Sequence, residues 1–372
     1  MRKNVKKQLA LRVLSTAALV AMVSSIATAA FADTYDLNTG SVTVETKANG
    51  ITYVTQKDDK QVDGFARNKN NEVLNEHPDD TGVTITSDGK QTSNTITVET
   101  AKDQTTDVTL ENVHIEVNTT DAKSGAIEIK GDGDTNLELN GDNTVLVKNR
   151  WSDEHAAIEK ADAYGKGTLT IKDDVNDNGS KKTGKKTGTD ADTTGKLVAG
   201  GYDNGAGIGG GGYHDGKSYA DTSNITITGG DITANGGVYG AGIGAGCYGD
   251  ASNIRIEGNA HVAAFGSGSA AIGSGYQSNG NSDITITDHA TVEAASDDAC
   301  GIGDGLNASG NATITISGHA SVHAEAQDYA AAIGSDTSSA TVNIEDHADV
   351  TAVSHSVAIG TSYGHEYNGG TS

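Results

Sequence analysis

A phrase of two small residues followed by Ile-Gly appears six times between Gly205 and Gly360. Its isoleucines are 35, 29, 30, 31 and 26 residues apart, and they are Ile208, Ile243, Ile272, Ile302, Ile333 and Ile359. Self-similarity at a period of about 20 to 50 residues is typical of solenoids and other arrays, in which each repeat packs on its neighbours. The spacing therefore predicts a stack of similar coils.

Two further apolar segments follow each repeat isoleucine. The first alternates apolar and polar residues, as in Ile254-Arg255-Ile256, and the second centres on one Ile or Val flanked by Ala, as at Val262. Alternation with a period of two indicates half-buried strands. Three short strands per turn of about 30 residues predict an all-β fold. We expect a right-handed parallel β-helix solenoid over residues 83–360, with the repeat isoleucines as neighbours on consecutive coils.

The remaining segments have other signatures. Residues 1–32 carry five basic residues, an apolar run and then Ala30-Phe31-Ala32, which is the layout of a cleaved secretory signal peptide. We expect an N-terminal capping region at 33–82, a polar loop insertion at 172–196 and a flexible tail at 361–372. No later apolar stretch approaches 18 residues, so we expect no membrane span after signal cleavage. The expected location is extracellular, either free or associated with the cell surface.

Charge and cysteine spacing narrow the partners and the crosslinks. The chain carries a net charge of −24 at pH 7, which repels nucleic acid and anionic membranes. The expected partner is an extracellular glycan or a host surface. Cys247 and Cys300 lie two repeats apart, about 9–10 Å along a stack of strands. A disulfide needs Cα atoms within about 7 Å, so we expect two thiols, with Cys300 in the small inward slot of Ala241 and Ala270.

Tyrosines gather around the repeat isoleucines. We expect a strip of outward-facing small residues beside them, namely Gly207, Gly242, Ala271, Gly301 and Ala332. Aromatic rings offer stacking area and their hydroxyls offer hydrogen bonds, so such a strip suits an extended sugar polymer. The alternative is that the rings only cover strand ends. The candidate ligand-binding residues are Tyr213, Tyr239, Tyr248, Tyr276, Tyr329 and Tyr363.

Three histidines recur at one corner of the repeat. His289, His319 and His347 end a two-residue corner that reads Gly229-Gly230 and Gly258-Asn259 in earlier repeats. Gly, Asn, Asp and His are the residues enriched at positive φ, so we expect the second corner position to be left-handed. Consecutive imidazoles would then lie about 5 Å apart. Metal binding is the alternative explanation for the column.

The residues give little support to a calcium site or to catalysis. Asp174, Asn176 and Asn178 match the opening of a calcium loop, but Lys185 stands where the bidentate acid belongs. No cofactor is expected, and calcium at these three residues stays open. Arg255 is flanked in its column by Thr226 and Thr285 rather than by carboxylates, so we expect a surface arginine and no enzyme. A polysaccharide lyase or hydrolase is the first rival function, and a purely structural stalk is the second.

Several segments resemble a known group of proteins. They are Thr95–Val98, Val108–Val113, Leu137–Thr144, GAGIGGGG at 205–212 and ITITGGDITANGG at 225–237. The chain resembles, over about residues 83–360, bacterial secreted β-helix proteins described as carbohydrate-binding domain-containing or adhesin-like surface proteins. For one branch the resemblance implies non-catalytic binding of acidic plant polysaccharide with calcium. The later repeats depart from it by replacing the Gly-Gly corner with Asp-His or Gly-His, which leaves the ligand open.

Overall fold

The computed structural model describes residues 33–57, 66–67, 72–77, 82–118, 125–148, 155–173, 195–214 and 217–362. They belong to one compact unit, Thr34–Ser372, apart from Asp33. The expected signal peptide at 1–32, residues 174–194 of the expected insertion and residues 363–372 of the expected tail lie outside the described residues. Within the described ranges, no helix is long and apolar enough to cross a membrane.

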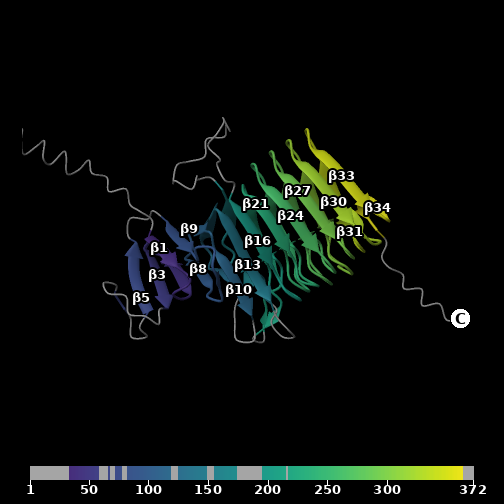
Figure 1. The fold of residues 1–372 in the computed structure, drawn as a ribbon. Coiled ribbons are helices and arrows are strands. Elements are labelled where there is room, and N and C mark those ends of the chain that lie inside the picture. The colour runs from purple at the N-terminus through teal and green to yellow at the C-terminus, as the bar shows by residue number, and fades with distance from the viewer. Residues whose placement is uncertain are drawn as a thin grey trace, which may run out of the picture. The chain divides into compact units, whose positions relative to one another are not determined.

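Three long sheets run through the described residues, and each coil adds one strand to each sheet. The prediction of a parallel β-helix with three strands per turn is confirmed. Figure 1 shows the strands of one sheet side by side in coil order. This Val/Ala sheet contains β7 (Gln91–Thr92), β10 (His114–Asn118), β13 (Asp142–Lys148), β16 (Lys196–Gly200), β21 (Asp231–Asn235), β24 (His261–Gly266), β27 (Thr291–Ser296), β30 (Ser321–Ala326) and β33 (Asp349–Ser354).

The second sheet carries the alternating Ile-x-Ile segments. Its strands pair in parallel from β6 onward, and its threonines alternate with buried isoleucines, as in Ile284-Thr285-Ile286. This Ile-x-Ile sheet contains β1 (Asp33–Asp36), β6 (Val83–Thr86), β9 (Thr105–Glu111), β12 (Asp134–Asn140), β15 (Leu169–Lys172), β20 (Thr222–Ile227), β23 (Ala251–Ile256), β26 (Ser282–Ile286), β29 (Ala312–Ile316) and β32 (Ala340–Ile344).

The third sheet carries the repeat isoleucines. It contains β2 (Val42–Thr46), β8 (Ile96–Thr100), β11 (Ile127–Lys130), β14 (Ile158–Glu159), β17 (Ile208–Gly209), β22 (Ile243–Gly244), β25 (Ile272–Gly273), β28 (Ile302–Gly303), β31 (Ala331–Ser335) and β34 (Val357–Thr361). Antiparallel strands β3 (Thr52–Lys57), β5 (Glu72–His77) and β4 (Ala66–Arg67) continue this Ile-Gly sheet beyond β2. The range 33–82 thus holds strands of the parallel ladder as well as an antiparallel extension.

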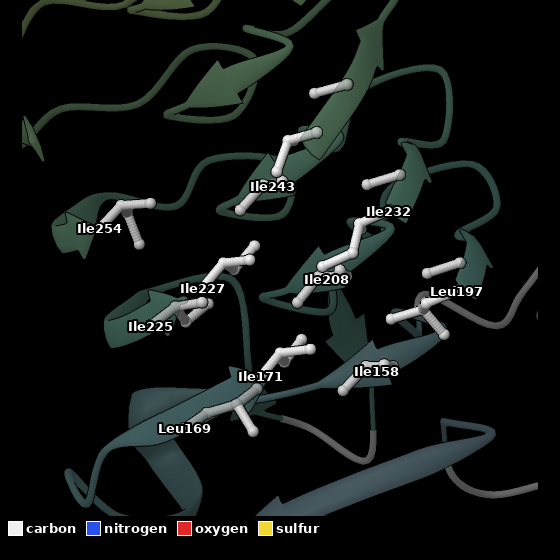
Figure 2. Close-up of a cluster of buried hydrophobic side chains, with 14 of the residues drawn as sticks. Ile158, Leu169, Ile171, Leu197, Ile208, Ile225, Ile227, Ile232, Ile243 and Ile254 are labelled. Atoms are coloured by element: carbon white, nitrogen blue, oxygen red, sulfur yellow. The ribbon is translucent and has the colours of Figure 1, made fainter. Parts of the chain in front are cut away.

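The isoleucine column lies inside the coil, as expected. Ile243 pairs with Ile208 on one side and Ile272 on the other, and all three are fully buried. Figure 2 shows Ile158, Ile208 and Ile243 in one column, with leucines and isoleucines of the other two sheets facing them. Each fully buried Ile contributes roughly 1.5–3 kcal/mol, and no coil can bury its own without a neighbour.

The glycine after each repeat isoleucine is required by the backbone. These glycines have φ between 128° and 147°, a region that residues with side chains rarely adopt. A Cβ on Gly273 would lie 1.9 Å from the carbonyl oxygen of Gly303, because consecutive coils approach closely here. The chain also folds back at this point, since Ala241 N donates to Ala245 O at 2.9 Å. Ile-Gly is therefore a short, tight segment rather than a regular strand.

The small residues before the isoleucines do not form an outward strip, so that prediction is wrong. Gly207, Gly242, Ala271, Gly301 and Ala332 are all buried. A Cβ on Gly242 would lie 2.8 Å from Ala234 O and 2.9 Å from Phe265 N, both in the Val/Ala sheet. These positions are small because the Ile-Gly sheet presses on the neighbouring sheet there. They offer no surface to a ligand.

The left-handed residue of the later corners is also not where we expected it. Gly258, Asp288, Gly318 and Asp346 have φ of 67°, 61°, 68° and 56°. They hold the first corner position, and only at Gly230 is the second position left-handed. The three histidines of the column accordingly have ordinary backbone conformations. Asp288 Oδ2 instead accepts from Gly258 N at 3.1 Å, which joins consecutive corners.

The close approach of coils at Ile-Gly predicts unequal effects for two glycine substitutions. Gly273 and Gly360 have similar φ, 140° and 128°, but the nearest atom to a Cβ on Gly360 is 3.7 Å away. Gly360→Ala should introduce only backbone strain, about 1–3 kcal/mol. Gly273→Ala should also force two coils apart, so its thermal midpoint should fall several degrees further. Circular dichroism melts of both variants measure this, and equal midpoints would contradict it.

Candidate functional site

Three of the candidate tyrosines form one aromatic cluster. The ring centroids of Tyr239 and Tyr276 are 4.9 Å apart, and those of Tyr248 and Tyr276 are 6.4 Å apart in an edge-on arrangement. Tyr248 is 60% exposed and Tyr239 is 38% exposed. Gln277 Nε2 donates to Tyr276 Oη at 3.1 Å and orients that hydroxyl. We call these three residues the tyrosine cluster.

The fold-back at Ile-Gly explains why these rings meet. Tyr239 precedes Ile243 and Tyr248 follows it, so the tight segment between them returns one loop towards the other. Tyr276 belongs to the next coil, and its N donates to Tyr239 O at 3.1 Å. Tyr248 N in turn donates to Tyr276 O at 2.8 Å. The backbone thus holds all three rings at one edge of the Ile-Gly sheet.

The other tyrosine candidates do not join this cluster. Tyr213 lies in a short hairpin of β18 (Tyr213–His214) and β19 (Lys217–Ser218), where its backbone pairs with Ser218. Tyr329 is 60% exposed and stands before Ile333, three coils beyond Tyr239. Tyr363 lies outside the described residues. The six residues named from the sequence therefore do not make one continuous row.

A hollow adjoins the tyrosine cluster. Its volume is about 300 Å³, and its lining residues are Gly201, Tyr202, Asp203, Gly236, Gly237, Val238 and Ser267. These residues come from three successive coils, so the hollow runs across the coils. Tyr239 directly follows Val238, and a Cβ on Gly268 would meet the Tyr239 ring at 3.4 Å. The hollow and the cluster therefore share an edge.

Apolar residues that we did not single out extend this surface. Tyr202 is 41% exposed and Val238 is 50% exposed, both in the hollow. Phe265 is 43% exposed on the next coil, opposite Asn235 in the ladder. The repeat pattern concealed them because they lie at the end of a Val/Ala strand or just after it rather than beside an isoleucine. Their signal in the sequence is a large apolar or aromatic residue at or just after the end of this strand, as where Phe265 stands between Asn235 and Ala295 in the ladder.

Tyr248 has an unusual backbone conformation for an aromatic residue. Its φ is +67°, in the left-handed region, where a bulky side chain is a rare outlier. The residues that follow it in the same column are Gln277 and Asn307, with φ of 53° and 58°. The fold would be better satisfied by Gly or Asn at this position. An exposed tyrosine held there against its preference indicates a role outside folding.

A buried polar network lies where the Ile-Gly pattern begins. Glu159 follows Ile158 at the position that glycine holds in later coils, between Glu128 and Gly209 in the ladder. Tyr164 Oη, in the 3₁₀ turn Asp162–Tyr164, donates to Glu159 Oε1 at 2.8 Å, and His155 Nδ1 lies 2.7 Å from Glu159 Oε2. Burial raises the pKa of Tyr164, and the Glu159 and Glu128 carboxylates raise it further.

The polar and charged side chains of this network pair with one another. Lys130 Nζ lies 2.7 Å from Glu128 Oε2 and 4.7 Å from the centre of the Tyr164 ring. His155 and Glu159 are 2% and 0% exposed. Buried charges persist when they are paired and hydrogen-bonded. The network therefore joins the early coils, which have longer Ile strands, to the later ones with the tight Ile-Gly segment.

The histidine column has the predicted stacking. The imidazole centroids are 5.2 Å apart for His289 and His319 and 5.0 Å apart for His319 and His347, with the rings within 5° of parallel. Across the described part of the chain, no group of three or more His, Cys, Asp or Glu side chains is arranged to hold a metal ion. The calcium candidates Asp174, Asn176 and Asn178 lie outside the described residues.

Arg255 and the cysteines are placed as expected. Arg255 is a surface residue whose guanidinium donates to Glu257 Oε2 at 2.8 Å. No disulfide joins Cys247 and Cys300, and both are buried. Cys300 occupies the inward slot that Ala241 and Ala270 fill in other coils, all at 0% exposure. Burial raises the pKa of the Cys300 thiol, and the nearby Asp304 raises it further.

Asp304 is a buried carboxylate in a nest of hydroxyls. It is fully buried, Ser282 Oγ donates to its Oδ1 at 2.8 Å, and its Oδ2 has no hydrogen-bond partner. Burial raises the pKa of Asp304 to about 6, although the surrounding hydroxyls of Ser282, Ser335 and Ser274 act to lower it. The carboxylate therefore destabilises the fold when it is ionised.

Comparison with known proteins supports the fold and goes no further. A family model for a beta helix repeat matches residues 225–247, which cover one corner and the following Ile-Gly segment. No curated protein and no solved structure matches the chain. The chain is a parallel β-helix protein.

The raised pKa of Asp304 predicts that stability increases as the solution becomes mildly acidic. Its pKa is about 6 in the folded chain and 3.8 ordinarily, so the folded chain takes up the proton first as pH falls from 7 to 5. The gain is about 1 kcal/mol by pH 5 and reaches about 3 kcal/mol only when the pH falls below 3.8. Asp304→Asn cannot take up this proton. The thermal midpoint of the wild type should therefore rise relative to that of the variant as the pH falls from 7 to 5. A constant difference across this range would contradict the assignment.

Proposed function

We propose that this chain is a secreted, non-catalytic carbohydrate-binding protein of adhesin-like type, and that it holds an extended glycan against the tyrosine cluster and the adjoining hollow. Tyr248 carries the proposal. It is exposed and belongs to a cluster of three rings. Its backbone is left-handed, a conformation that Gly or Asn would adopt at lower cost. Strained residues of this kind gather at binding sites, where the surrounding structure holds them.

The shape and chemistry of the surface support a sugar polymer. Sugar rings stack on aromatic faces and their hydroxyls form hydrogen bonds with polar groups. Tyrosine supplies both an aromatic face and a hydroxyl. The hollow crosses three coils, which are about 4.8 Å apart, so it suits a ligand extended along the stack. The secretory leader expected at residues 1–32 supports an extracellular partner. The resemblance to carbohydrate-binding surface proteins points in the same direction.

Removing two rings of the cluster should abolish most binding. Each ring is worth about 1 kcal/mol, so Tyr248→Ala with Tyr276→Ala should weaken binding by about 30-fold. The measurement is pull-down and titration with a panel of immobilised polysaccharides, with and without chelator. Tyr329→Ala is the matched control, because Tyr329 is as exposed as Tyr248 but stands outside the cluster. Equal effects of the two changes would contradict this choice of surface, and release of reducing or unsaturated sugars would favour an enzyme.

A second variant separates binding from folding at the same position. Tyr248→Asn places in this coil the residue found at Asn307 in the same column. Because Asn tolerates the left-handed region, the variant should be as stable as wild type or more stable, by about 1 kcal/mol. It should nevertheless bind the glycan at least about 5-fold more weakly. Thermal melts and titrations test the two effects together, and a variant that loses stability would contradict the argument.

A further inference from the structure

The coils that carry the tyrosine cluster are strongly acidic. Residues 195–362 contain 18 acidic residues and three basic ones, Lys196, Lys217 and Arg255, which gives a net charge of −15 with histidines neutral. Arg255 is paired with Glu257 on the Ile-x-Ile sheet. Lys217 belongs to the short hairpin β19. Any ligand of the cluster therefore approaches a predominantly negative surface.

Carboxylates lie next to the cluster itself. Asp203 lines the hollow. Asp250 follows Tyr248 by two residues, and its Oδ1 accepts from Ser278 Oγ at 2.6 Å and from Gly280 N at 2.7 Å. Ser278 and Gly280 follow Tyr276 by two and four residues in the next coil. These bonds hold a carboxylate close to the rings.

The surface also becomes more acidic along the stack. Asp297 N donates to Gly266 O, so Asp297 follows Ser267 of the hollow on the next coil, about 4.8 Å away. By the same pairing, the column of Tyr239 continues through Gly268 and Asp298 to Asp328. A polymer laid across the coils from the cluster thus meets carboxylates within about one Debye length at 0.1 M salt, about 10 Å.

We infer that the glycan held by the tyrosine cluster is uncharged, and that polymers bearing carboxylate or sulfate groups are excluded from it. This inference rests on the proposed function. It departs from the acidic plant polysaccharide that the resemblance implies, because the described surface repels such a chain. The aromatic rings supply affinity that needs no charge on the ligand, and the surrounding carboxylates supply the selection against anions.

Matched polymer pairs test the inference. The probes are uncharged cellulose, β-glucan and pullulan derivatives, each beside its carboxymethylated form of similar length, titrated at 20 mM and 500 mM NaCl with chelator. For at least one backbone, the uncharged form should bind at least 10-fold more tightly at 20 mM salt. The difference should narrow at 500 mM, because salt screens repulsion. A separate arm repeats the titrations with calcium in place of chelator.

Neutralised variants locate the repulsion. Asp297→Asn with Asp328→Asn removes two exposed charges two and three coils along the stack from Val238 and Tyr239, and it should bring the affinity for the carboxymethylated polymer closer to that for its uncharged partner. Asp283→Asn with Glu345→Gln is the control, because it removes two exposed charges from the β26 and β32 region. It should reduce the difference in affinity between the uncharged and carboxymethylated polymers by less.

The outcomes separate the two proposals. Tighter binding of a carboxymethylated form, with or without calcium, overturns the inference and leaves glycan binding intact. No binding to any polymer overturns the proposed function itself. Binding that Tyr248→Ala with Tyr276→Ala does not reduce shows that the ligand uses another surface, which overturns both.

Discussion

The structure depends on how closely consecutive coils approach at the Ile-Gly segments. A Cβ on Gly209, Gly273 or Gly334 would lie within 2 Å of a carbonyl oxygen of the next coil, and each of these glycines has a φ that other residues rarely adopt. Backbone contact at this distance lets a strand of only two residues continue a parallel ladder. It also places every repeat isoleucine over its neighbour, so the core is shared between coils and no coil is stable alone.

The same constraint creates the surface that we assign to ligand binding. Because the Ile-Gly segment is so short, the loops before and after it come together at one edge of the sheet. Side chains on these loops are free to vary, since the ladder is formed by the segment between them. The column of Tyr239 continues as Gly268 and Asp298 and that of Tyr248 as Gln277 and Asn307. Two adjacent coils, by contrast, place the rings of Tyr239, Tyr248 and Tyr276 in contact. The later coils repeat the fold without repeating this cluster of three rings.

Two groups of buried polar side chains differ in how completely they are hydrogen-bonded. The Glu159 network and the hydroxyl nest of Asp304 both lie beside the Ile-Gly sheet, where the chain departs from regular strand geometry. Glu159 is satisfied by Tyr164 and by His155, while Asp304 keeps one carboxylate oxygen without a partner. The first arrangement joins two kinds of coil, and the second makes the fold sensitive to mild acid. Neither has a signature in the repeat pattern, because each depends on side chains from different coils.

The spacing of the isoleucines, the period-2 alternation and the Gly after each Ile were enough to predict the all-β coil, its three strands per turn and the stacking of Ile243 on Ile272. These features follow from a periodic pattern, because each turn of the coil carries the same order of strands and corners. The sequence also named all three residues of the tyrosine cluster, but among others that lie elsewhere. Only the tertiary structure decided that Gly242 and Ala271 face a neighbouring sheet, that the corner turns at Asp288 rather than His289, and that Tyr202 and Val238 border the rings. Such facts depend on how closely two sheets pack and on the φ of single residues, and a periodic pattern does not encode either.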